Sequence, residues 1–220
     1  MSYGIYIGAN HSSDGHGWLA GYGDEPSSHW LELAESKTHG DDARITVGMT
    51  PEAGMPGQLS QIPQASQTAR LLRVNYSAYL GAPAPLTNGG LNEHGVAVRD
   101  IWSPSCTDLA KLTPTDQTGP NYSDLARIVL ERAHSAREGV DIIESLIAQY
   151  GYSTYGGNSH IIADAHEAWI VIEFAGGLGL WVAERLGPDS IRASRPGYIG
   201  QVPLEANEDF RFPAHFITTA

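Results

Sequence analysis

The order of strand-like and helix-like segments predicts an α+β fold. Short alternating or β-branched stretches fill much of residues 3–101, two helical stretches follow within residues 122–151, and strand patterns return in residues 159–195. Strands and helices grouped in this way are typical of α+β domains built from stacked layers. The chain has 220 residues, 41% of them hydrophobic, so it can bury the core of a single domain spanning residues 1–220.

The N-terminal residues predict a β-hairpin. Tyr3 to Ile7 has the alternation of a short strand, and Gly8 ends it. Residues 11–17 are polar and glycine-rich, which indicates a turn, and residues 17–22 form the second strand. Most chain termini are poorly ordered, so a strand that begins at the third residue indicates that the N-terminus has a role in the protein.

Further strands are expected in the next hundred residues. Arg44 to Met49 is strand-like, and Arg73 to Leu80 alternates apolar residues on one face. Asn88 to Gly90 and Asn92 to Gly95 each have the composition of a turn, and Val96 to Ile101 forms a strand after the second turn.

Two helices and a set of strands complete the expected fold. Ser123 is a suitable N-cap for the first helix, and the second runs from Ser135 to Tyr150, with Gly151 as its stop. The stretch "HIIADAHEAWIVIEF" then predicts a hairpin that turns at residues 164–167. The segments "LWVAERL" and "SIRAS" predict two more strands.

The composition excludes several classes of function. Lys and Arg total 13 against 25 Asp and Glu, and this net charge of -12 argues against nucleic acid and anionic membranes as partners. No apolar run is long enough to span a membrane, and the lone Cys106 suits a reducing compartment, so we expect a cytoplasmic protein. The nine histidines do not cluster and no glycine-rich phosphate loop is present, so we expect neither a metal nor another cofactor.

Four local motifs carry a resemblance to a known family. Ile7-Gly8 and Asp14-Gly15 lie at and beyond the end of the first strand, "GGLNEHGVAV" comes before the helices, "YSDLARIVLERAHSAREGVDIIESLIAQYG" is the helix pair, and "SHIIADAHEAWIVIE" comes after it. In order and spacing the chain resembles the N-terminal-cysteine dipeptidases of the N-terminal-nucleophile hydrolase superfamily. The resemblance implies a four-layer αββα sandwich and, as partner, a small amide or dipeptide substrate.

Ser2 stands where that family has its nucleophilic cysteine. A hydroxyl or thiol is a weak nucleophile until a base lies beside it, and a free α-amino group, with a pKa near ~8, can be that base. One residue then supplies both groups, provided that Met1 is removed. The sequence does not decide whether Ser2 is natural or replaces a cysteine.

The resemblance carries further site residues onto Asp24 and Asn92. Asp24 matches the acid that orients the amine, and Asn92 could donate its amide to the oxyanion or could simply form the turn. Two positions depart from the family pattern: Gly21 replaces an arginine, and Arg195 replaces an asparagine. Arg195 is therefore expected either to fill the space left at Gly21 or to be a surface arginine paired with an acid.

The resemblance implies an amide-bond hydrolase that works through an acyl-enzyme on residue 2. Two alternatives stay open: an acyltransferase that passes the acyl group to an amine, and a catalytically silent binding protein on the same fold. The sequence also leaves open whether residues 1–220 are part of a longer chain and whether the protein forms a homo-oligomer.

Overall fold

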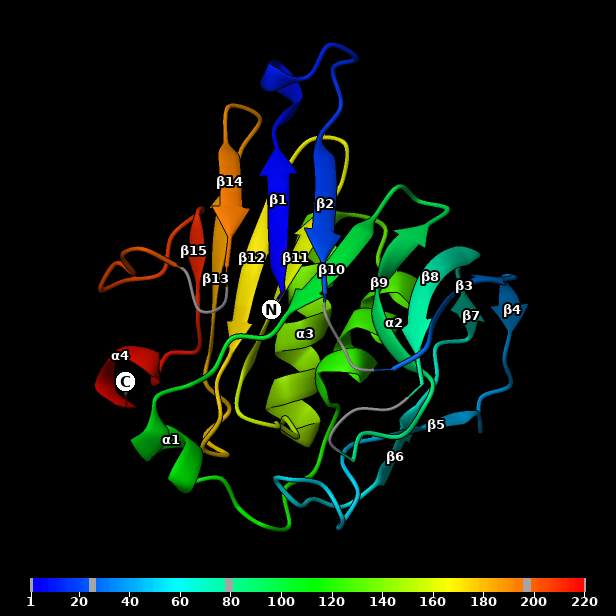
Figure 1. The fold of residues 1–220 in the computed structure, drawn as a ribbon, viewed down its shortest axis with the longest axis vertical. Helices are drawn as coiled ribbons and strands as arrows, with labels where there is room; N and C mark the ends of the chain where they lie inside the picture. Colours follow the sequence, from blue (N-terminus) through cyan, green and yellow to red (C-terminus); the bar gives the residue numbers. More distant parts are fainter. Residues whose placement is uncertain (1, 24–26, 78–80, 196–198, 220) are drawn as a thin grey trace.

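The structure is a computed structural model that describes residues 2–23, 27–77, 81–195 and 199–219. Its largest element is an eight-stranded antiparallel sheet in the order β15-β13-β12-β11-β10-β9-β8-β3 (Figure 1). These strands are β3 (His29–Ala34), β8 (Leu71–Tyr76), β9 (Leu86–Asn92), β10 (Ala97–Ile101), β11 (Asn158–Ala163), β12 (Ala168–Glu173), β13 (Trp181–Leu186) and β15 (Phe210–Arg211). The central strands β11 and β12 are buried along their whole length, because both faces of the sheet are covered there.

A smaller sheet of three strands packs on one face of the large sheet. Its order is β14 (Ile191–Ser194), β1 (Tyr3–Ile7) and β2 (Trp18–Tyr22), and a short 3-10 helix (Ala9–His11) follows β1. The first strand of the chain is thus the central strand of this sheet, hydrogen-bonded on both edges. The first residues of β1 lie over the large sheet (Figure 1). The predicted N-terminal hairpin is confirmed.

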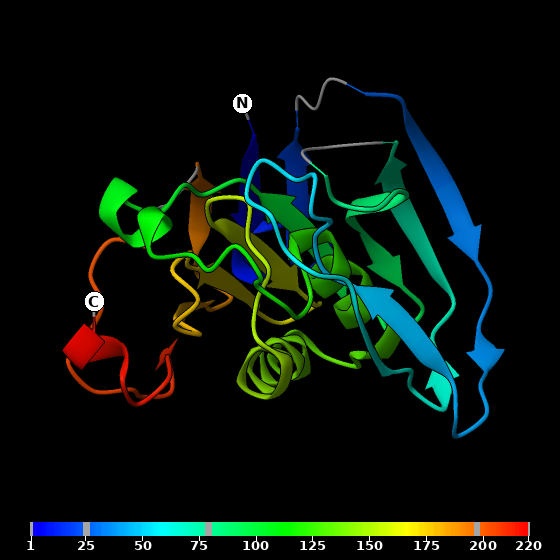
Figure 2. The same ribbon diagram turned by 90° about the horizontal axis from the view of Figure 1, so that it is seen from below.

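Two helices cover the opposite face of the large sheet. α2 (Tyr122–Arg132) and α3 (Ala136–Tyr150) bury their apolar stripes against β9 to β12, around Trp169. Figure 2 shows the layers in order: the small sheet, the large sheet, then the helix pair. The predicted α+β class is confirmed, and these are the sheet, sheet and helix layers of an αββα sandwich.

The remaining elements are short. They are α1 (Thr107–Lys111), α4 (Phe216–Thr219), the pair β4 (Lys37–Thr38) and β7 (Gln67–Thr68), and the pair β5 (Arg44–Val47) and β6 (Ser60–Pro63). The strand predicted at residues 44–49 is confirmed as β5, which ends two residues earlier, at Val47.

Two local predictions are wrong. Asn88 to Gly90 is not a turn but lies inside β9, where the register against β8 shifts and Gly89 has a φ of 156°. A β-bulge uses the same residue types as a turn, which explains the error. The first helix is capped by Asn121, not Ser123, because the Asn121 side chain and Asp124 form a reciprocal capping box.

Part of the large sheet presents apolar side chains to solvent. Cross-strand pairing puts Leu33, Leu72 and Leu91 on one face of the large sheet, and all three are exposed. The small sheet covers the same face, but over other strands. The outer face of the small sheet also exposes Trp18 and Tyr22. Contiguous apolar surface of this kind marks a face that can contact more polypeptide.

Candidate functional site

Ser2 lies at the start of β1, on the face of the small sheet that points toward the large sheet. Only 8% of the residue is exposed, and its Oγ accepts a hydrogen bond from the backbone N–H of Trp102, with N and Oγ 3.2 Å apart. Trp102 directly follows β10, so the bond joins the beginning of the small sheet to the end of a central strand of the large one. A predicted nucleophile is therefore held in a defined position between the two sheets.

Tight packing between the sheets fixes this position. Gly4, the next inward-facing residue on β1, lies so close to the large sheet that a Cβ there would be 2.5 Å from Cδ1 of Ile161 and 2.8 Å from Cδ1 of Ile101. Tyr6, one more step along the same face, is fully buried. A glycine at position 4 lets the backbone of β1 approach β10 and β11, and this approach sets the depth of Ser2.

Asp24, the predicted partner of the amine, lies outside the described residues. Its role stays a prediction. The structure describes β2 as far as Tyr22 and then Gly23, which lead toward it.

Asn92 has a structural role at the end of the large sheet far from Ser2. Its side-chain N–H groups donate to the carbonyls of Leu130 and Ala133 at the end of α2, at 3.1 Å and 2.7 Å. Its Oδ1 accepts from the backbone of His94 and Val96, which closes the turn. The length of β10, about 3.3 Å per residue, separates Asn92 from Ser2. Of the two roles that the sequence left open, this geometry corresponds to the turn former.

Arg195 does not fill the space at Gly21, so the predicted exchange is corrected. Side chains alternate between the faces of a strand, and the register pairs Gly21 with Gly4 and Gly4 with Ser194, all on the inner face. Arg195, one residue beyond Ser194, is exposed and lines a surface cavity with the outward-facing Tyr3. Whether Arg195 contributes to the reaction stays a prediction.

The side chain of Arg99 occupies the space at Gly21 instead. A Cβ at position 21 would lie 2.6 Å from both Cγ and Cδ of Arg99, which projects from β10 toward the small sheet. Nothing in the local pattern of "GVAVRDIW" distinguishes Arg99 from an ordinary strand arginine. Only the stacking of the two sheets brings it opposite Gly21.

A second polar group lies on the other face of the large sheet, under the helices. His160 Nδ1 is 2.7 Å from Glu173 Oε1, and His160 Nε2 is 2.9 Å from the carbonyl oxygen of Tyr122; both charged residues are fully buried. Burial works to lower the pKa of His160, but the carboxyl group of Glu173 outweighs it and the pKa is raised. Burial also raises the pKa of Glu173. The pair has no access for a substrate and ties β11 and β12 to the start of α2.

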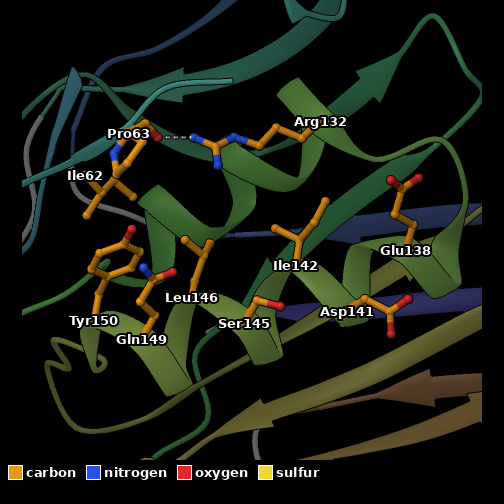
Figure 3. Close-up of a pocket in the computed structure, with 10 residues that line it drawn as sticks. All are labelled: Ile62, Pro63, Arg132, Glu138, Asp141, Ile142, Ser145, Leu146, Gln149 and Tyr150. Atoms are coloured by element: carbon orange, nitrogen blue, oxygen red, sulfur yellow. Dashed lines mark hydrogen bonds between the residues drawn. The ribbon is translucent and has the colours of Figure 1, made fainter. Parts of the chain in front are cut away.

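A cavity of about 420 Å³ also lies on the helix side, between α3 and the end of β6 (Figure 3). Arg132 reaches across it and donates to the carbonyl of Pro63 at 2.9 Å. Ser145 and Asp141 line the cavity from α3, with no histidine or lysine among the residues that line it. It lies on the opposite face of the large sheet from Ser2, so it is not part of the site around residue 2.

The described residues contain no group of three or more metal-binding side chains. They also contain no helix with the length and apolar character of a membrane span.

Comparisons with known proteins agree with the predicted family. The model of Peptidase family C69 matches residues 84–212, more than half of the chain. A probable dipeptidase A of Streptococcus pyogenes serotype M1 is 30% identical over 134 residues, which are 60% of this chain and 27% of that protein. A probable dipeptidase B of Streptococcus pyogenes serotype M3 is 30% identical over 123 residues, 54% of this chain and 24% of that protein.

Distant likenesses to solved structures accompany these matches. The penicillin V acylase from Agrobacterium tumefaciens has a TM-score of 0.46 and 16% identity, over 90% of this chain and 53% of that one. A mutant conjugated bile acid hydrolase from Clostridium perfringens has a TM-score of 0.43 and 11% identity, over 88% and 50%.

The matched segments amount to about a quarter of the length of the curated relatives. The family model nevertheless covers β9 to β15, including the helix pair and the hairpin whose motifs suggested the family. The chain belongs to Peptidase family C69.

Proposed function

We propose that the protein hydrolyses the amide bond of a dipeptide or another small N-acyl compound, with the side chain of residue 2 as nucleophile. One observation carries the proposal: Ser2 lies buried between the sheets at the start of the central strand β1, with its Oγ held by the N–H of Trp102. Membership of a peptidase family supports the reaction class.

The reaction requires the α-amino group of Ser2 to be free, so Met1 must first be removed. The neutral amine takes the proton of the Oγ hydroxyl while Oγ attacks the substrate carbonyl carbon and forms the new C–O bond. The carbonyl oxygen becomes an oxyanion, which requires hydrogen-bond donors beside residue 2 for its stabilisation. The C–N bond then breaks, and the ammonium returns its proton to the leaving amine.

The ester on Oγ is cleaved in the second half of the reaction. The amine, again neutral, takes a proton from a water molecule that attacks the ester carbonyl. The C–O bond to Oγ breaks, Oγ recovers a proton, and the acid product leaves. No step requires a metal or another cofactor.

The cellular location and the partner of this activity are also proposals. We place the protein in the cytoplasm, a location supported by its free cysteine, Cys106. The expected partner is a small substrate, and the net charge of -12 disfavours polyanions. Self-association of the chain stays an open expectation.

The test is turnover of a panel of dipeptides by protein whose N-terminus has been read by intact-mass measurement. Protein that begins at Ser2 should hydrolyse at least one dipeptide, and Ser2→Ala should not. A matched sample that keeps an uncleavable N-terminal extension should be folded and inactive, because its residue 2 has no free amine.

Two outcomes would overturn the proposal. Full activity in the extended protein would exclude the α-amine as base, and activity in Ser2→Ala would exclude the nucleophile. Adding an amine acceptor and measuring the acyl-amine product separates hydrolysis from acyl transfer.

A further inference from the structure

Arg99 carries a charge that the described structure does not neutralise. Its Nε and Nη2 are both buried and have no hydrogen-bond partner among the described residues. The remaining nitrogen, Nη1, donates a long bond of 3.4 Å to the backbone carbonyl of Asn88. A guanidinium stays protonated at any pH that proteins experience, so it cannot relieve burial by losing its charge. Leaving such a charge buried without a partner is costly.

Among the described residues, none of those that face Arg99 supplies an anion. The next residue along β10, Asp100, belongs to the opposite face of the strand, because side chains alternate. On the small sheet the facing positions are Gly4 and Gly21, which have no side chain. Asn88, at the bulge in β9, has a buried Oδ1 that also has no partner among the described residues.

Arg99 is close to the predicted nucleophile and on the same side of the sheets. Gly21 is the cross-strand neighbour of Gly4, and Ser2 is two residues from Gly4 on the same inward face. Strand geometry then separates the backbones of Gly21 and Ser2 by about 8 Å. A dipeptide, at about 3.5 Å per residue, bridges such a span.

We propose that Arg99 binds the free carboxylate of the amino acid that the reaction releases, and so selects substrates with a C-terminal acid. Nε and Nη2 lie on one edge of the guanidinium, which is the edge that forms two parallel hydrogen bonds with a carboxylate. The Nε and Nη2 of Arg99, unpaired among the described residues, suit the carboxylate end of a dipeptide, and the nearby hydroxyl of Ser2 suits its amide carbonyl. The inference rests on the proposed function.

The test compares a dipeptide with its C-terminal amide, which lacks the negative charge. For the wild type, kcat/KM should be higher for the free acid. Arg99→Met keeps the length of the side chain but loses the charge, so it should lower kcat/KM for the acid by about 10- to 100-fold, mainly through KM, and leave the amide nearly unchanged. Arg99→Lys should retain part of the preference. Arg44→Met, at an exposed arginine on β5, is the matched control and should keep the wild-type ratio.

Binding to an inactive protein separates this inference from the proposed function. Titration calorimetry with Ser2→Ala should detect the free acid binding more tightly than the amide, and Arg99→Met in that background should equalise the two. If the wild type cleaves neither peptide, the proposed function fails while this comparison still decides the role of Arg99. Equal losses for acid and amide, no loss for either, or unfolding of both Arg99→Met and Arg99→Lys would assign Arg99 a structural role and overturn the proposal.

Discussion

The imidazole of His160 and the carboxyl group of Glu173 share a proton in the interior, with Nδ1 and Oε1 2.7 Å apart. The carbonyl of Tyr122 accepts a hydrogen bond from Nε2, so Nε2 carries a proton. The contact between Nδ1 and Oε1 therefore holds a second proton, bound to one group or the other. Both pKa values are raised, which means that the folded protein retains this proton where the unfolded chain has lost it.

This pair should make the protein less stable as the pH rises above neutrality. An unfolded histidine loses its proton near pH ~6.5, while folded His160 keeps the shared proton to higher pH. Above that value the folded state binds one proton more than the unfolded state, so the free energy of unfolding falls by up to about 1.4 kcal/mol per pH unit until the folded pKa is passed. Urea unfolding between pH 6 and pH 9 measures the slope.

Glu173→Gln should reduce that slope. A glutamine amide can donate to Nδ1 of a neutral imidazole, so the variant needs no shared proton and its stability should be flatter above neutrality. His166→Gln, at an exposed histidine in the turn between β11 and β12, serves as the control and should keep the wild-type slope. Parallel curves for the wild type and Glu173→Gln would contradict the shared proton.

Asn92→Ala should destabilise the fold without impairing the chemistry. It removes two donors to the end of α2 and an acceptor for two backbone N–H groups, all at a buried position. Unsatisfied buried groups cost about 1–3 kcal/mol each, so the free energy of unfolding should fall by more than about 2 kcal/mol. In a folded sample kcat should be close to that of the wild type. An oxyanion donor would instead cost about 10²–10³ in kcat, and a loss of that size would restore the catalytic role.

The elements that the sequence predicted best have strong local signals. α3 begins after Ser135 and ends before Gly151 as expected, because its N-cap, apolar stripe and glycine stop agree with one another. β3 was not predicted: it lies at an edge of the sheet and exposes Trp30, Leu31 and Leu33, so it lacks the alternation of a half-buried strand. Nor does the composition of Asn88 to Gly90 distinguish a bulge from a turn.

Ser2 could be predicted as the nucleophile because the family resemblance places that role at the start of the chain, and position in the chain is visible in a sequence. Arg99 and the pair of His160 and Glu173 were not found, since each is made significant by contacts between distant strands. His160 and Glu173 sit in apolar runs that look like ordinary buried strands. The exchange predicted for Arg195 rested on one arginine missing at Gly21 and another appearing at position 195, and a sequence does not show which face of the sheet each position occupies.

If Ser2 replaces a cysteine, Ser2→Cys should increase turnover by about one order of magnitude, because a thiol is partly ionised near neutral pH and is intrinsically more nucleophilic than a hydroxyl. The introduced thiol should also react with iodoacetamide, with the exposed Cys106 as internal comparison. Peptide mass mapping reads both positions. A variant that is alkylated at position 2 but turns over no faster than the wild type would contradict the idea that Ser2 replaces a cysteine, and an active Ser2→Ala variant would contradict the role of residue 2.

Gly21→Ala should disturb the packing of Arg99. The added methyl group would lie 2.6 Å from two carbons in the middle of the Arg99 side chain, so that side chain or β2 must move. Overpacking of this kind costs about 1–3 kcal/mol, measurable by urea unfolding. Gly40→Ala is the matched control, because a Cβ there meets nothing within 4 Å. Equal stability of the two variants would show that Arg99 does not fill the space at Gly21.

Double-mutant cycles can decide which arginine occupies that space. Gly21→Arg brings a second guanidinium against Arg99, so combining it with Arg99→Ala should relieve the crowding, and the pair should be non-additive by more than about 0.5 kcal/mol in unfolding free energy. Gly21→Arg combined with Arg195→Asn should be additive within about 0.3–0.5 kcal/mol, because Arg195 lies on the outer face of the small sheet and Gly21 on the inner one. Urea unfolding of the wild type, the three single variants and the two double variants measures both couplings. Strong coupling of Gly21 to Arg195 but not to Arg99 would reverse this assignment and return the exchange to Arg195.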